Sequence, residues 1–260
     1  MYIIKLGGSV ITDKAKEFCF KKEIMDNLAK QIKKANKEII LVHGAGSFGH
    51  ILAKKYNLND GYKNFDQIKG FSLTQSMVQN LNSLVLKSLH EYSIPAVSIS
   101  PHAILKLDNH GLLKIDYEIF QDYIKNKFAP IAFGDVVLDK TLGFSICSGD
   151  LLMQTLSQHF FPEKAIFVTD EDGLYTSNPK KDKNAELIEE VSIANLENLT
   201  TSLDAHADVT GGMKGKIEMI KNIAKNGTDV VLLNGNKPDR LYQVLVGEKP
   251  KHTIVYGDKK

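Results

Sequence analysis

Short runs rich in isoleucine and valine alternate along the chain with longer segments in which apolar residues recur at helical spacing. A short run that is apolar throughout is typical of a strand covered on both faces. Its alternation with helical segments predicts a layered α/β fold. The expected strands are 2–6, 39–42, 95–99, 130–133, 165–168 and 230–233.

The segment after the first expected strand shows the helical pattern clearly. Phe20, Ile24, Leu28 and Ile32 recur every fourth residue, so they share one face of an amphipathic helix. Similar patterns predict four further helices, the third of which stops at an Asn-Gly pair. These helices are expected at 66–92, 149–160, 213–225 and 239–246.

Two stretches interrupt the alternation. Residues 104–115 predict two short strands that turn at Asn109-His110-Gly111, and residues 136–147 predict another pair that turns near Gly143. Both are expected as β-hairpins projecting from the main sheet. With no repeat or low-complexity linker, we expect one domain over 1–260, divided near residue 162 into an acceptor lobe (1–162) and a nucleotide lobe (163–260).

Composition and charge narrow the class of protein. The chain has 33 lysines and arginines against 31 acids, a formal charge of +2, which is too balanced to predict a nucleic acid partner. No apolar run approaches the roughly 20 residues that span a bilayer, and the N-terminus does not resemble a signal peptide. Cys19 and Cys147 match no metal or redox spacing, which suits a reducing compartment. We expect a cytoplasmic protein without a membrane partner.

The first segment with candidate chemistry is Lys5-Leu6-Gly7-Gly8-Ser9, at the end of the first expected strand. Adjacent glycines let the main chain pass close to a ligand and present amide donors, as in loops that bind phosphate. Lys5 lies in an otherwise apolar strand, where an unpaired ammonium is costly to bury unless an anion lies nearby. The alternative is a simple turn beside a lysine whose amine reaches solvent.

The second segment follows the strand at 39–42 and contains Gly44, Gly46, Gly49 and His50. The glycine spacing satisfies G-x-G-x-x-G, the fingerprint of dinucleotide-binding proteins. That fingerprint expects a carboxylate about 20 residues later, at the end of the next strand, and the strand at 95–99 has none there. The same amides at a helix N-terminus bind any phosphate, so we favour a phosphate site in which His50 contacts the ligand.

Two further segments open expected helices. Ser148-Gly149-Asp150 precedes the helix at 149–160; it is either an N-cap or a place where Asp150 orients nearby lysines. In the segment that opens the expected helix at 213–225, Gly211 and Gly212 precede Lys214 and Lys216. Lysines in a first helical turn are opposed by the helix dipole, which indicates an anion opposite them; a solvated lysine pair is the alternative.

Together, the candidate cations Lys5, Lys14 and Lys216 and two amide-lined loops suit phosphoryl transfer. That reaction needs alignment and charge neutralisation rather than covalent chemistry from the protein. The chain has neither the Walker A pattern nor the motif set of protein kinases.

The segment 5–9 with Lys14, the glycine-rich loop, and the segments 169–175 and 210–213 with Lys216 resemble the amino acid kinase superfamily, in order and over essentially the whole chain. The resemblance implies a three-layer αβα sandwich with a mainly parallel central sheet. Within the superfamily, residues 46–50 resemble those of isopentenyl phosphate kinases, which convert isopentenyl phosphate and ATP to isopentenyl diphosphate and ADP. Fosfomycin kinases are similar around the histidine.

This resemblance implies a role for each candidate residue. His50 and the amides of Ala45 and Gly49, helped by Gly149, would hold the acceptor phosphate. Lys14 would stabilise the transferring group, with Lys5 assisting and Asp150 orienting the lysines. The ATP-binding residues would be Lys5, Gly7, Gly8, Ser9, Gly46, Asp170, Gly212 and Lys216.

The resemblance also implies Mg²⁺ carried mainly by the ATP phosphates, no metal-binding side chains of the protein, and a homodimer. Ala45 departs from the family's pattern, because many relatives carry glycine at this position. Alanine can still offer its amide to the acceptor phosphate unless the position requires a positive φ. A kinase of another small phosphate or phosphonate such as fosfomycin, a dinucleotide-binding oxidoreductase and a non-catalytic nucleotide sensor stay open as alternatives.

The acceptor's apolar tail needs a pocket of its own. Five apolar residues near the candidate segments could line it, although aliphatic residues at helical spacing are more often core, which we favour. They are Phe71, Val78, Leu81, Val85 and Ile146.

Overall fold

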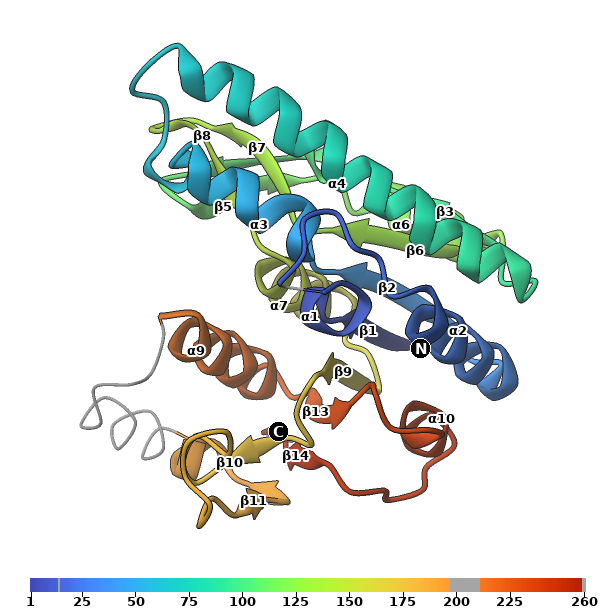
Figure 1. The fold of residues 1–260 in the computed structure, drawn as a ribbon. Coiled ribbons are helices and arrows are strands. Elements are labelled where there is room, and N and C mark those ends of the chain that lie inside the picture. The colour runs from blue at the N-terminus through green and yellow to red at the C-terminus, as the bar shows by residue number, and fades with distance from the viewer. Residues whose placement is uncertain (14, 197–210, 259–260) are drawn as a thin grey trace.

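The structure is a computed structural model that describes residues 1–13, 15–196 and 211–258 (Figure 1). An eight-stranded sheet, in the order β12-β14-β13-β9-β1-β2-β6-β3, runs through the molecule. Neighbouring strands are parallel except β13 and β14. The strands are β1 (Tyr2–Leu6), β2 (Ile39–His43), β3 (Ala96–Ser98), β6 (Ala129–Phe133), β9 (Lys164–Thr169), β12 (Glu190–Val191), β13 (Asp229–Asn234) and β14 (Thr253–Val255). The six predicted strands are confirmed.

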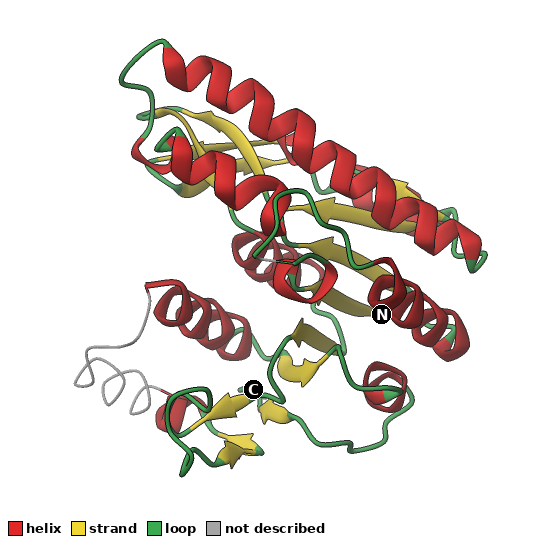
Figure 2. Ribbon diagram, in the orientation of Figure 1, coloured by secondary structure: helices red, strands yellow, loops and turns green. Residues whose placement is uncertain are grey.

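Helices cover both faces of this sheet (Figure 2). Successive residues of a strand point to opposite faces, so Ile4 packs against one layer of helices and Ile3 against the other. The first layer holds α2 (Lys22–Ala35), α4 (Asp66–Glu91) and α10 (Arg240–Leu245); the second holds α6 (Glu118–Lys125), α7 (Gly149–Phe160) and α9 (Gly211–Lys225). The predicted three-layer αβα sandwich is confirmed.

Short elements complete the fold. They include the helices α1 (Gly8–Ile11), α3 (Gly46–Lys55) and α5 (Pro101–Ile104), a 3-10 turn at Leu58–Asp60, and the strand pair β10 (Leu174–Tyr175) and β11 (Leu187–Ile188). Among the described helices, none is long and apolar enough to cross a membrane. Strands on both sides of residue 162 share the main sheet, and the division into two lobes there stays a prediction.

The two expected hairpins are present, but they are not separate. They are β4 (Leu105–Asp108) with β5 (Gly111–Ile115) and β7 (Asp135–Asp139) with β8 (Gly143–Cys147). Leu107 pairs with Asp139, which joins both hairpins into one four-stranded sheet.

Asp139 supplies the physical reason for this joining. Its buried carboxylate accepts hydrogen bonds from amides in the turns of both hairpins and from the hydroxyl of Ser145, at 2.9–3.0 Å. The amide donors are Asn109, His110, Thr141 and Leu142. One side chain therefore fixes two turns that are about 30 residues apart.

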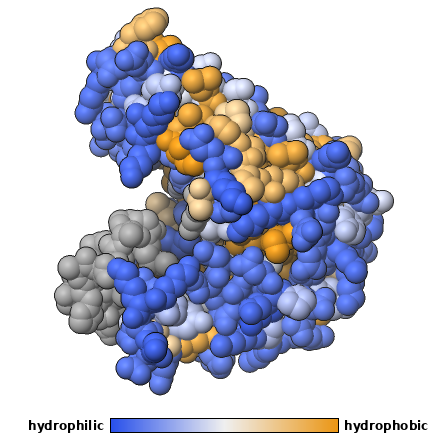
Figure 3. Space-filling model, viewed as in Figure 1, coloured by the Kyte–Doolittle hydropathy of each residue, from blue (hydrophilic) through white to orange (hydrophobic). Residues whose placement is uncertain are grey.

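The strand order reverses beside β1. From β1 the chain passes to α1 and α2 on one face of the sheet, whereas from its neighbour β9 it continues to α9 on the other. In open α/β sheets, ligands bind at the carboxyl ends of the strands at such a reversal. In the space-filling view, the surface is indented at the left, between the upper part that holds α3 and α4 and the lower part (Figure 3).

Candidate active site

A cavity of about 390 Å³ lies at the carboxyl ends of β1, β2, β6 and β9. All but two of the predicted site residues line it. Gly212 lies in the first turn of α9, and Lys14 lies outside the described residues. The predicted residues that line the cavity are Lys5, Gly7, Gly8, Ser9, Ala45, Gly46, Gly49, His50, Gly149, Asp150, Asp170 and Lys216.

The two glycine-rich loops touch each other through their main chains. A Cβ atom at Gly8 would lie 2.5 Å from the amide nitrogen of Gly46, and one at Gly44 would lie 2.7 Å from that of Gly8. Gly46 also has a positive φ of 50°, which favours glycine. These glycines are therefore required for the close approach of the two loops.

Helices α3 and α7 both begin at the cavity, so their first amides, which have no acceptor within the helix, can face a bound anion. Ala45 has φ of −67°, a conformation that alanine adopts without strain, so its departure from the usual glycine costs nothing. The expected role of the Gly49 amide is to donate to the acceptor phosphate. In the structure this amide donates to the carbonyl of Ala45 at 3.2 Å. Gly49 instead leaves space, because a Cβ there would lie 2.5 Å from that of Ala45.

The buried Lys5 and the partly exposed Asp150 form an ion pair at the cavity, with 2.7 Å between Nζ and Oδ1. Ser148 caps α7 by accepting the amide of Leu151, so Asp150 is available for the lysine. Burial lowers the pKa of Lys5, the charge of Asp150 opposes this, and the charge of Lys216 lowers the pKa further. A Cβ at Gly149 would lie 3.0 Å from Cε of Lys5, so the lysine reaches the cavity through the space that this glycine leaves.

The pair gives a pH-dependent prediction for Asp150→Asn. An ammonium neutralises a bound anion only when it is protonated, so an activity that depends on Lys5 is expected to fall as pH rises through the lowered pKa of Lys5. Loss of the carboxylate removes the charge that holds this pKa up, so the alkaline limb of kcat/KM is expected to move to lower pH. Rate profiles of both proteins check the shift, and coincident alkaline limbs would contradict it.

Polar contacts join the loops that follow β1 and β9 at one side of the cavity. The hydroxyl of Ser9 donates to Asp170 at 2.9 Å, and Lys180 lies 3.6 Å from the other oxygen of that carboxylate. Lys216 lines the cavity from α9. Because α9 begins at Gly211 rather than at the expected residue 213, Lys216 lies in the second turn of the helix and not in its first.

The opposite end of the cavity is more apolar. Val78 and Ile146, two of the five candidates for a tail pocket, line it with Ala53, Thr74 and Val136. The other three pack elsewhere. Leu81 and Val85 belong to the core between α4 and the main sheet, and Phe71 packs against Phe144 with 5.3 Å between ring centroids. The core interpretation is therefore right for Leu81 and Val85. Val78 and Ile146 line the cavity, but Val78 is also fully buried and Ile146 packs against the cluster that contains Phe144, so the tail pocket stays a prediction.

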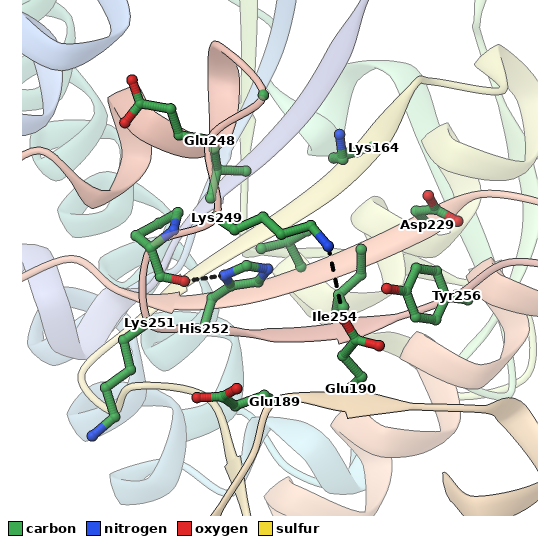
Figure 4. A pocket seen from close by; sticks show the side chains of 14 residues that line it. Lys164, Glu189, Glu190, Asp229, Glu248, Lys249, Lys251, His252, Ile254 and Tyr256 are labelled. Carbon is green, nitrogen blue, oxygen red and sulfur yellow. Dashed lines mark hydrogen bonds and ion pairs between the residues drawn. The ribbon is translucent and has the colours of Figure 1, made fainter.

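A second hollow, of about 560 Å³, lies between β13, β14 and the segment 247–252 (Figure 4). Positively and negatively charged side chains line this hollow, and Lys249 lies 3.9 Å from Glu190. His252 contacts the carbonyl of Pro250. The hollow contains Lys164 and Asp229 from the amino ends of β9 and β13, away from the glycine-rich loops. We therefore place the chemistry in the smaller cavity.

The comparison with known proteins agrees with this geometry. A model of the amino acid kinase family matches residues 1–234. This chain belongs to the amino acid kinase family. Membership makes it a phosphotransferase, and the alternative of a dinucleotide-binding oxidoreductase is wrong.

Several relatives that match the chain along nearly its whole length are named isopentenyl phosphate kinase. The isopentenyl phosphate kinase of Methanothermobacter thermautotrophicus is 38% identical over 99% of both chains. A crystal structure of an isopentenyl phosphate kinase superposes with a TM-score of 0.87 at 34% identity, covering 98% of this chain and 99% of the other. A substrate complex of such an enzyme gives 0.83 at 28% identity, covering 98% and 100%. The predicted resemblance to this group is confirmed.

Proposed function

We propose that this enzyme transfers the γ-phosphoryl group of ATP to isopentenyl phosphate, giving isopentenyl diphosphate and ADP. One observation carries the proposal: a single cavity is lined by two amide-bearing loops, by Lys5, His50 and Lys216, and at one end by aliphatic side chains. Two phosphorylated substrates and a short hydrocarbon tail need all three kinds of surface. The relatives with this name support the choice of acceptor.

In this proposal, the loop after β1 and Lys216 bind the ATP phosphates, and the first turn of α3 with His50 binds the acceptor phosphate. Lys5, held by Asp150, neutralises charge as the phosphoryl group moves. Lys14, outside the described residues, would stabilise the transferring group. Gly149 and Asp170 complete the walls on the acceptor and nucleotide sides.

We also propose that Mg²⁺ enters with ATP as part of the substrate, bound mainly by phosphate oxygens, because Mg²⁺ commonly binds substrate phosphates with few protein ligands.

Resemblance to relatives supports a homodimer, which light scattering after size-exclusion chromatography tests. Both cysteines are free thiols, which supports a reducing, cytoplasmic setting; fractionation of cells tests it.

An acceptor panel tests the function. ADP release is measured with ATP plus isopentenyl phosphate, fosfomycin or methyl phosphate, and with no acceptor. Turnover is expected to be highest with isopentenyl phosphate, because methyl phosphate cannot fill the apolar end. Turnover with fosfomycin alone would make the enzyme a phosphonate kinase, and no turnover above the no-acceptor background would contradict the proposal.

His50→Ala is expected to raise the KM for isopentenyl phosphate about tenfold, as loss of one charge-assisted hydrogen bond does, and to leave the KM for ATP nearly unchanged. Initial rates at varied concentrations of each substrate give both constants. His90→Ala, which alters an exposed histidine of α4, is the matched control and is expected to change neither. Equal rises in both KM values would remove His50 from the acceptor site.

A further inference from the structure

Thr12 lies where the two glycine-rich loops meet, and it is fully buried. Its hydroxyl donates to the carbonyl of Gly8 at 2.7 Å and accepts the amide of Ser47 at 3.0 Å. One oxygen atom therefore connects the loop after β1 with the first turn of α3. Packing there is tight, because a Cβ atom at Gly46 would lie 2.2 Å from this oxygen.

The hydroxyl of Thr12 acts as a helix cap supplied from another part of the chain. The second amide of a helix normally bonds to a side-chain oxygen at the N-cap, but the N-cap residue of α3 is Ala45, which has none. Thr12 supplies the missing acceptor to Ser47. This fixes the orientation of the first turn, where Ala45 and Gly46 line the cavity.

We propose that Thr12 is a positioning residue that sets the separation between the nucleotide-binding loop and the acceptor-binding end of α3. The inference rests on the proposed kinase reaction, in which each loop binds a different substrate. Each binary complex needs only one loop in its correct shape, whereas transfer needs the two phosphates in line. The hydroxyl of Thr12 therefore contributes to kcat more than to the binding of either substrate.

The test replaces Thr12 by valine, which keeps the shape and removes the hydroxyl. Because small misplacements of reacting groups cost up to about a hundredfold in rate, kcat is expected to fall by about 10- to 100-fold. The KM of each substrate is expected to stay within about threefold. Thr12→Ser, which keeps the oxygen, is expected to retain most of the wild-type kcat.

Thr253 in β14 offers a matched control. It too is fully buried, and its hydroxyl donates to the carbonyl of Ile188 at 2.6 Å and accepts the amide of Leu174 at 2.8 Å. It makes the same two bonds but joins β14 to β10 and β11 instead of the two loops. Thr253→Val is therefore expected to lower thermal stability about as much as Thr12→Val while leaving kcat within about threefold.

Three results would overturn the inference: a wild-type kcat in Thr12→Val, an equal loss of kcat in Thr253→Val, or no recovery in Thr12→Ser. Failure of the proposed function is a separate result, since it shows as no turnover by the wild-type enzyme. In that case hydrogen–deuterium exchange decides: peptides containing Ser47 are expected to exchange faster in Thr12→Val than in Thr12→Ser, and equal exchange would refute the link.

Discussion

Replacement of Lys5 by methionine is expected to lower kcat by about a thousandfold, the scale of losing a charged group that faces a transferring phosphoryl. Methionine keeps the length and the apolar stem of the side chain, so the strand remains packed. What is lost is the ammonium that Asp150 holds at 2.7 Å on the cavity wall. Steady-state ADP release at saturating substrates measures the change.

Two companion variants give the loss a definite cause. In Lys5→Met with Asp150→Asn, the carboxylate is neutral too; recovery of activity would trace the defect to an unpaired carboxylate rather than to the missing ammonium. Lys164→Met alters a half-buried lysine at the amino end of the neighbouring strand β9, far from the cavity. It is expected to retain kcat within about threefold.

Replacement of Asp139 by asparagine is expected to lower the free energy of unfolding by about 3 kcal/mol, because an amide cannot accept every bond that the carboxylate accepts, and buried donors lose their partner. Urea unfolding measures the loss. Asp108→Asn is the matched control in the same region. Asp108 accepts the hydroxyl of Thr141 and lies 3.6 Å from Lys140 at the surface, so its loss is expected to cost less than about 1 kcal/mol.

The effect of Asp139 depends on pH in a defined direction. Burial alone would raise the pKa of this carboxyl, but hydrogen bonds from His110, Leu142, Ser145 and Asn109 outweigh it and hold the pKa well below its usual range. Its stabilisation is therefore complete above the ordinary aspartate pKa of about 4 and is lost as pH falls below it. Wild type and Asp139→Asn are expected to converge in stability in acid, and a constant difference down to pH 2, roughly, would contradict this.

The central strands could be predicted from sequence because both their faces are buried, so Ile3 and Ile4 of β1 are equally apolar. The strands β12 and β14, at one end of the sheet, could not. β12 has two residues and β14 has three, too few for a periodic pattern to emerge. The start of α9 at Gly211 was missed for another reason, since glycine is a poor helix former and an expected helix excludes it.

The candidate site divides along the same line. A glycine directly after a strand is a signal that can be read from the local sequence. Because ligands bind where the strand order reverses, Gly8 and Gly46 can then be assigned to the same site. Thr12, Thr74 and Val136 carry no such signal, because their position depends on contacts between distant segments. The joining of the hairpins depends likewise on Asp139, whose bonds to Asn109 and His110 cross about 30 residues of sequence.

The contact between Gly8 and Gly46 has a consequence for the fidelity of the enzyme. Since a single carbon atom placed on Gly8 would already overlap the neighbouring loop at 2.5 Å, no water molecule fits into the seam. Water competes with every kinase acceptor at far higher concentration, and transfer to it wastes ATP. In the proposed reaction, a wall built from two main chains in direct contact would keep solvent from the γ-phosphorus on that side and leave the acceptor's own approach open.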